Sequence, residues 1–167
     1  TISATTRMRG RRPKAISTHA CIGFPPRDTA GAIAALELAQ AYIEEVRDAD
    51  VPGYADATMR KLHLNTLGLA SKQLDTCQKL DPDAALEGKD AQGNACRNGL
   101  NELRAEVFLL EGLTHQGHDI RRAITALTAA THLSPDNPHA FFALGLTQAA
   151  TGNKSAAVAA LRSATSL

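Results

Sequence analysis

Residues 138–167 read PHAFFALGLTQAATGNKSAAVAALRSATSL, and the second half of this stretch repeats an earlier part of the chain. The matching residues lie 34 positions apart, with Ala123, Leu127, Ala130 and Leu133 returning as Ala157, Leu161, Ala164 and Leu167. A fixed period of this size is typical of stacked repeats, because each unit buries its apolar face on the next one. The sequence therefore predicts a repeat array, an architecture that usually serves as a binding surface.

The composition favours helices. Hydrophobic residues make up 44% of the 167 positions, which is enough to bury one sizeable core. Aromatic residues make up only 4%, while Ala and Leu, which lose little on entering a helix, are abundant. Glu37 interrupts the best apolar stretch, at 30–43, so no segment is long enough to span a bilayer. We expect a soluble, all-α domain over 28–167.

The N-terminal stretch 1–27 differs in charge from the rest. It contains no acid and six basic residues, namely Arg7, Arg9, Arg11, Arg12, Lys14 and Arg27, whereas the remaining chain carries 12 basic and 17 acidic residues. Such a basic arm can contact nucleic acid or an anionic membrane through phosphate groups. It can also be a solvated terminus or one docked on the acidic body, and its composition is that of a transit peptide as well. Cytoplasmic location is favoured over export after cleavage.

Apolar residues recur every three or four positions in six segments, and Pro, Gly and Asp residues separate them. Asp28 or Thr29 can cap the first segment, and Asn137 and Asn153 can cap the last two. The predicted helices cover about 29–49, 56–80, 95–116, 119–133, 138–151 and 153–166, with 82–94 as a loop. Paired in order, they make about three antiparallel hairpins, at 28–81, 95–134 and 135–167, of which the first is lengthened and atypical.

The stretch 138–167 resembles a tetratricopeptide repeat. The pattern of this family is carried by Phe141, Leu144, Gly145, Gln148, Gly152, Ala157, Leu161 and Ala164, with Gln148 in place of the usual aromatic residue. The preceding unit matches in its second helix at a spacing of 34, but Phe108 and Gly112 resemble Phe141 and Gly145 at a spacing of 33. The register of that first helix is therefore open. The resemblance implies a right-handed α-solenoid.

A tetratricopeptide array implies a non-enzymatic scaffold that binds a protein or peptide on its concave face, which the first helices of the hairpins form. The positions that would face a partner are His139, Phe142, Leu146 and Ala149 in the last unit, and Phe108, Gly112, His115 and Gln116 in the preceding unit. Phe142 is the strongest candidate, because Phe141 already serves the internal core. The alternative is that Phe142 packs on the preceding hairpin.

Two other functions stay open. The last helix carries Val158, Leu161 and Leu167, and this apolar face can pair with a second copy of the chain to form a homo-oligomer. In the other hypothesis, the helices present Arg7, Arg9, Arg11, Arg12 and Lys14 to nucleic acid or an anionic membrane.

Catalytic and metal-binding patterns are weak throughout the sequence. No GxSxG, HExxH or dinucleotide-binding pattern occurs, so we expect no enzymatic activity, catalytic residue or cofactor. His115 and His118 flank Gly117 at a predicted turn, where solvated side chains are favoured over a metal site. Cys21, Cys77 and Cys96 fit buried thiols of a reduced protein, although a Cys77–Cys96 disulfide would pin the loop between them.

Overall fold

The computed structural model describes residues 27–49, 56–89 and 95–167, and its regular structure is mainly helical. In chain order, the elements are α1 (Thr29–Asp48), α2 (Ala57–Leu80), β1 (Ala85–Lys89), β2 (Ala95–Gly99), α3 (Leu100–His115), α4 (Ile120–Leu133), α5 (Pro138–Ala150) and α6 (Lys154–Ser166). The prediction of a mainly helical fold is confirmed. None of the helices in the described part of the chain is apolar over a stretch long enough to cross a membrane.

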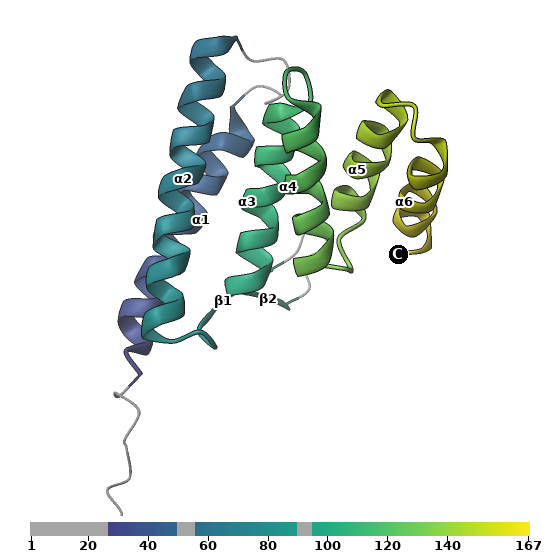
Figure 1. Ribbon diagram of the computed structural model, residues 1–167. Coiled ribbons are helices and arrows are strands. Elements are labelled where there is room, and N and C mark those ends of the chain that lie inside the picture. The colour runs from purple at the N-terminus through teal and green to yellow at the C-terminus, as the bar shows by residue number, and fades with distance from the viewer. Residues whose placement is uncertain (1–26, 50–55, 90–94) are drawn as a thin grey trace, which may run out of the picture.

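Consecutive helices pack in pairs, α1 on α2, α3 on α4 and α5 on α6 (Figure 1). Neighbouring pairs also touch, because α3 packs on both α1 and α2, and α5 packs on both α4 and α3. The helices α1, α3 and α5 therefore follow one another along one side of the molecule, which we call the odd-helix side.

The helices begin where the sequence supplies a side-chain cap. The carboxylate of Asp28 accepts a hydrogen bond from the N–H of Gly31 at 2.9 Å, and Asn137 accepts one from the N–H of His139 at 3.0 Å. Asn153 caps α6 in the same way, just after Gly152, whose φ of +79° lies in the left-handed region that favours glycine. The capping residues expected at the starts of α1, α5 and α6 are confirmed.

The largest buried side chains lie between α1, α2 and α3. Leu36 and Ile43 of α1 and Leu74 of α2 are completely buried, and Leu103 and Val107 of α3 join the same core. Leu36 and Ile43 lie seven positions apart, and Leu103 and Val107 lie four apart, so each pair shares one apolar face of its helix. Each fully buried Leu or Ile side chain contributes about 1.5 to 3 kcal/mol of hydrophobic free energy. The core therefore holds α3 on the first hairpin.

A β hairpin stands where the sequence analysis placed a loop over 82–94 and the start of a helix at residue 95. β1 and β2 pair antiparallel, with Ala85 opposite Gly99 and Glu87 opposite Arg97, and α3 begins only at Leu100. The predicted loop is therefore wrong over 85–89, and the predicted helix start at residue 95 is wrong, while 90–94 lie outside the described residues. The segments read ALEGK and ACRNG, which lack alternating β-branched or aromatic residues, so local preference gives no strand signal.

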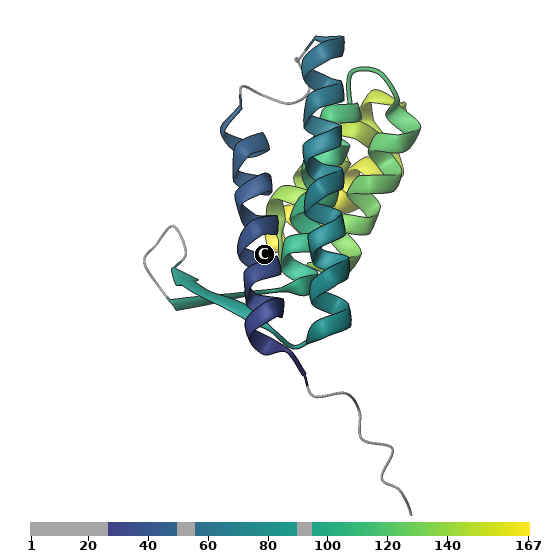
Figure 2. The same ribbon diagram turned by 90° about the vertical axis from the view of Figure 1, so that its left-hand side faces the viewer.

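Packing explains the hairpin better than local preference does. β1 contacts α1, and β2 contacts α3. Leu86 of β1 is half-buried against the core. Figure 2 shows the hairpin crossing α1 and projecting beyond it on the side away from α2. The hairpin therefore extends the molecule next to the first odd-numbered helix.

One polar side chain is buried in α2 without a partner. His63 is 4% exposed, and neither of its ring nitrogens has a hydrogen-bond partner in the described structure. A buried polar group that forms no hydrogen bond costs about 1 to 3 kcal/mol of stability. The first hairpin thus combines a large apolar core with one unfavourable polar group.

Candidate functional site

The four predicted binding residues of α5, namely His139, Phe142, Leu146 and Ala149, are all exposed. Phe142 is 52% exposed and Leu146 is 48% exposed, so each leaves about half of a large apolar side chain uncovered. His139 is also exposed, one turn before Phe142. Residues three or four positions apart lie on one face of a helix, so the side chains of His139, Phe142 and Leu146 form one surface, which we call the α5 patch. The alternative in which Phe142 is covered by the preceding hairpin is not what the structure shows.

The predicted residues of α3 lie in different surroundings. His115 is only 9% exposed, whereas Phe108 is half-buried and lines a groove of about 410 Å³ together with Arg104 and Leu133. Gln116 donates hydrogen bonds from its amide nitrogen to Thr147 Oγ1 at 2.7 Å and to the carbonyl of Ala143 at 3.4 Å. Gln116 therefore ties the end of α3 to α5, and the α3 residues do not continue the α5 patch as one exposed row.

The small residues at the helix crossings fix the register between the two repeats. A Cβ atom on Gly112 would lie 2.5 Å from Leu127 Cγ. A Cβ atom on Gly145 would lie 2.7 Å from Leu161 Cγ, and either added Cβ would also lie 3.3 Å from the backbone oxygen of an alanine, Ala123 or Ala157. Both distances to the Leu Cγ atoms are far shorter than an ordinary contact, so only glycine fits without movement. Gly112 thus corresponds to Gly145 at a spacing of 33, while their partner leucines correspond at 34.

A second pair of residues supports the same register. Thr114 and Thr147 are both buried, and each hydroxyl donates a 2.7 Å hydrogen bond to the carbonyl four residues earlier in its helix. At a spacing of 33, the α3 residues that correspond to Phe142 and Leu146 are Leu109 and Leu113, both half-buried. The spacing of 34 instead predicts Phe108 and Gly112 as binding positions, which is why sequence alone does not identify these two leucines.

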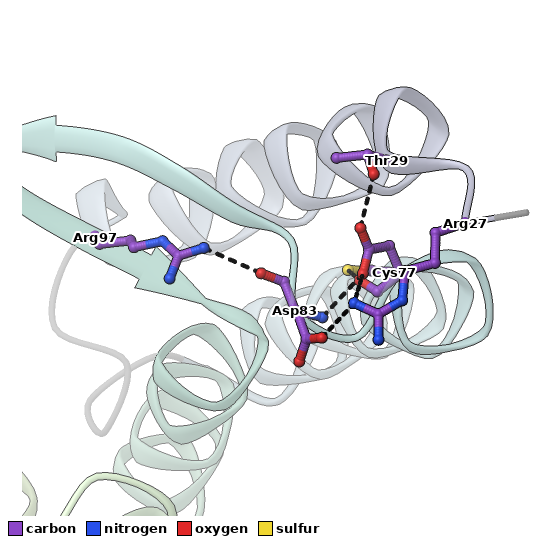
Figure 3. A network of polar contacts seen from close by, with 6 residues as sticks. Arg27, Thr29, Cys77, Asp83 and Arg97 are labelled. Atoms are coloured by element: carbon purple, nitrogen blue, oxygen red, sulfur yellow. Dashed lines mark hydrogen bonds and ion pairs between the residues drawn. The ribbon is translucent and has the colours of Figure 1, made fainter.

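A polar network closes the end of the first hairpin (Figure 3). Thr29 of α1 donates a 2.7 Å hydrogen bond to Asp81, which follows α2 and is 5% exposed. Arg27 pairs with Asp81 at 3.4 Å and also with Asp83. The guanidinium of Arg97 in β2 donates to the carbonyl of Asp83 at 3.2 Å. The network therefore connects the start of α1, the end of α2 and the β hairpin.

The network changes the acidity of two groups. The hydrogen bond from Thr29 is the main reason why the pKa of Asp81 is lowered, and the N–H of Asp83 and the charge of Arg27 act in the same direction against burial. Burial raises the pKa of the Cys77 thiol, and the neighbouring Asp81 carboxylate adds to this shift. Cys77 is free, so the alternative of a disulfide to Cys96 is not adopted. A buried, protonated thiol is a poor nucleophile.

The structure offers no metal site within 27–49, 56–89 and 95–167, because no three His, Cys, Asp or Glu side chains of these ranges cluster as ligands would. His118 is exposed at the turn that precedes α4. The basic residues Arg7, Arg9, Arg11, Arg12 and Lys14 lie outside the described residues. The hypotheses of nucleic-acid or membrane contact through this arm therefore stay predictions from sequence.

Comparison with models of known families, with curated proteins and with solved structures gives no match to this chain. The resemblance to tetratricopeptide repeats thus rests on the residues of 104–167 themselves.

Proposed function

We propose that this protein is a non-enzymatic interaction scaffold that binds a protein or peptide on its odd-helix side. The observation that carries the proposal is the α5 patch, where Phe142 and Leu146 stay about half exposed one helical turn apart. Exposed apolar residues that lie together mark interaction sites more often than single ones do. Aromatic side chains are also frequent among the residues that contribute most to binding.

The packing of the hairpins supports a tetratricopeptide-like array. The contact of Gly112 with Leu127 and Ala123 recurs as the contact of Gly145 with Leu161 and Ala157. In a solenoid of such units, each repeat contacts its neighbours, and the first helices of the units line a common surface. The contacts of α3 with α1 and with α5 agree with that arrangement.

A partner for the α5 patch needs an apolar anchor. His139 at the edge of the patch offers a polar contact, and Leu146 also lines a hollow of about 150 Å³ with Gln116, Ile120 and Ala150. An apolar side chain of a bound peptide would cover Phe142 and reach this hollow, while the peptide backbone would stay near the polar rim. This division into an apolar centre and a polar edge is usual for protein interfaces.

The experiment is affinity capture from a lysate with quantification of the retained proteins. We expect the double variant Phe142→Ala and Leu146→Ala to lose proteins that the wild-type chain retains. The matched control is Leu62→Ala with Leu69→Ala, which removes two leucines of α2 that are 50% and 42% exposed. Equal losses in both double variants, or no loss in the α5 variant, would contradict the proposal.

Self-association is a second candidate, favoured by the outer face of α6. Val158 of α6 is 47% exposed, and Leu167, which follows the helix, is 60% exposed, so apolar surface is uncovered in this part of the chain. A second copy stacked there would continue the array. Light scattering tests this idea, because the molar mass should rise with concentration in the wild type but not in Val158→Lys. A constant monomer mass over the whole range would exclude it.

A further inference from the structure

A groove of about 470 Å³ lies between α1 and the β hairpin. Its walls come from one face of α1, where the lining residues lie three, four or seven positions apart, and from the first three residues of β1. The residues that matter for its chemistry are Ile33, Glu37, Ala41, Glu44, Leu86 and Glu87. The groove is thus built jointly by the first odd-numbered helix and by the inserted hairpin.

The acidic side chains of the groove are exposed and poorly neutralised. Glu37 has no ion-pair partner among the residues that the structure describes, and Glu44 accepts one hydrogen bond from the neutral amide of Gln40. Glu87 is 3.7 Å from Arg97, but both side chains of this pair are largely exposed, which makes it a weak interaction. None of the described residues that line the groove is basic. The groove therefore presents net negative charge.

The spacing of the carboxylates suits an extended chain. Glu37 and Glu44 are two turns apart, about 10 Å along the helix axis. Side chains on one face of an extended peptide recur about every 6.6 Å, so Lys or Arg side chains two positions apart can reach the two carboxylates with their long, flexible stems. Ile33, Ala41 and Leu86 provide an apolar floor between the acids, on which the aliphatic stems of Lys or Arg can lie while the charged ends reach the carboxylates.

The hairpin adds a backbone surface to these side chains. Within the described residues, the sheet has two strands, so β1 pairs with β2 on one edge and has no strand on the other. The N–H and C=O groups of such an edge can pair with an added extended segment. An extended basic peptide therefore finds both charge partners and backbone partners next to this groove.

We propose that the groove between α1 and β1 binds an extended, basic segment of a partner protein, with Lys or Arg side chains paired to Glu37, Glu44 and Glu87. This proposal rests on the proposed function, because α1 belongs to the same odd-helix side as α5. It names the chemistry of one part of the partner, while the α5 patch takes an apolar part.

The test uses two labelled synthetic peptides and the full chain, with binding followed by fluorescence anisotropy. One peptide alternates Lys and Thr, and the control peptide of equal length alternates Glu and Thr. We expect the Lys–Thr peptide to bind and the Glu–Thr peptide not to bind. The affinity for the Lys–Thr peptide should fall as salt is added. The double variant Glu37→Gln and Glu44→Gln should weaken this binding about fivefold, as expected for two exposed ion pairs.

The matched control is Glu45→Gln with Asp48→Asn. These two exposed acids lie on the same helix but do not line the groove, so the net charge changes equally while the groove stays intact. Binding by this variant should stay within about twofold of the wild type. Equal weakening by both double variants would show general charge attraction and overturn the proposal. Failure of the full-length wild type to bind the Lys–Thr peptide would also overturn it.

The two proposals can fail separately. The Glu37→Gln, Glu44→Gln variant could bind the peptide normally while the α5 variant loses captured proteins. That result would contradict only the proposal of a basic segment in the groove. The groove variant could instead bind the peptide more weakly while the α5 variant captures the same proteins as wild type. That result would contradict only the proposed binding role of the α5 patch. Circular dichroism spectra check that the variants keep their helices.

Discussion

The α1–α2 hairpin and the α5–α6 hairpin bury different kinds of side chain. In the first, Leu36, Ile43 and Leu74 are completely buried. In the second, the buried residues are small or polar, namely Ala140, Ala143, Gly145, Thr147, Ala157 and Ala160. The larger side chains of Phe142 and Leu146 are about half exposed to solvent. The first hairpin thus buries large apolar side chains completely, whereas the last hairpin leaves Phe142 and Leu146 about half exposed.

The difference suggests that the first hairpin mainly stabilises the fold and that the last hairpin mainly serves binding. Regions with few buried apolar contacts open at lower free energy than the core does, and binding segments are often drawn from such regions. The first hairpin also carries the polar network around Asp81 and the inserted strands, which fix its end. We therefore expect mutations in the first hairpin to affect folding most, and mutations on α5 to affect binding with little change in stability.

The largest expected effect is a difference in stability when a core leucine of each hairpin is replaced by alanine. Leu74→Ala should lower the free energy of unfolding by about 3 kcal/mol, because it leaves a cavity at a completely buried site. Leu161→Ala in α6 should cost about half as much, since Leu161 is only half-buried. Urea unfolding of the two variants measures the difference. Equal losses, or a larger loss in Leu161→Ala, would remove the distinction between the hairpins.

The next effect tests the two glycines at the helix crossings. Gly145→Ala and Gly112→Ala should each destabilise by about 1 kcal/mol or more, because the clash with a leucine outweighs the gain in helix propensity. Gly68→Ala in α2 is the matched control, since a Cβ there meets nothing within 4 Å. It should stabilise by about 0.5 to 1 kcal/mol. Stabilisation at all three sites would show that the crossings are looser than described.

A third variant addresses the unpaired histidine in the first hairpin. His63→Leu should raise the free energy of unfolding by about 1 kcal/mol, because an apolar side chain of similar size removes two buried nitrogens without hydrogen bonds. His132→Leu on the exposed face of α4 is the control and should change stability little. Thermal unfolding compares the two. Destabilisation by His63→Leu would mean that the histidine ring makes a favourable interaction.

The smallest effect depends on pH and concerns the end of the first hairpin. The pKa of Asp81 is lowered in the folded state, so its charged form adds stability above its unfolded pKa of about 3.9 and loses it as the pH falls through the folded pKa. Thr29→Val removes the main cause of this shift. It should therefore be less stable than the wild type near neutral pH, and the gap should shrink below about pH 4. A pH-independent gap would contradict this assignment.

Local sequence signals were sufficient for most of the helices. Asp28, Asn137 and Asn153 mark helix starts because a cap depends only on the next few residues. The β hairpin could not be predicted in this way, since its strands are held by α1 and α3 rather than by their own residue preferences. For the same reason, Glu87 was placed in a loop, and its position opposite Glu37 and Glu44 could not be seen.

Sequence comparison alone does not decide the register between the two repeats. Gly112 and Gly145 are aligned at a spacing of 33, but the second helices repeat at a spacing of 34. Both spacings are compatible with the sequence of the first helices. The contacts of the two glycines with Leu127 and Leu161 decide between them. The predicted α5 residues were exposed as expected, whereas His115 lies in a buried position, because the α3 positions were counted in the other register.

Backbone hydrogen exchange of the full chain tests the claim of a partner-binding odd-helix side most directly. The measurement compares the free protein with a complex of the protein and a partner that wild type captures but the Phe142→Ala, Leu146→Ala variant loses. We predict slower exchange in α5 and in the facing parts of α3 and α1, with little change in α2, α4 and α6. Slower exchange confined to α2, α4 and α6 would contradict the claim.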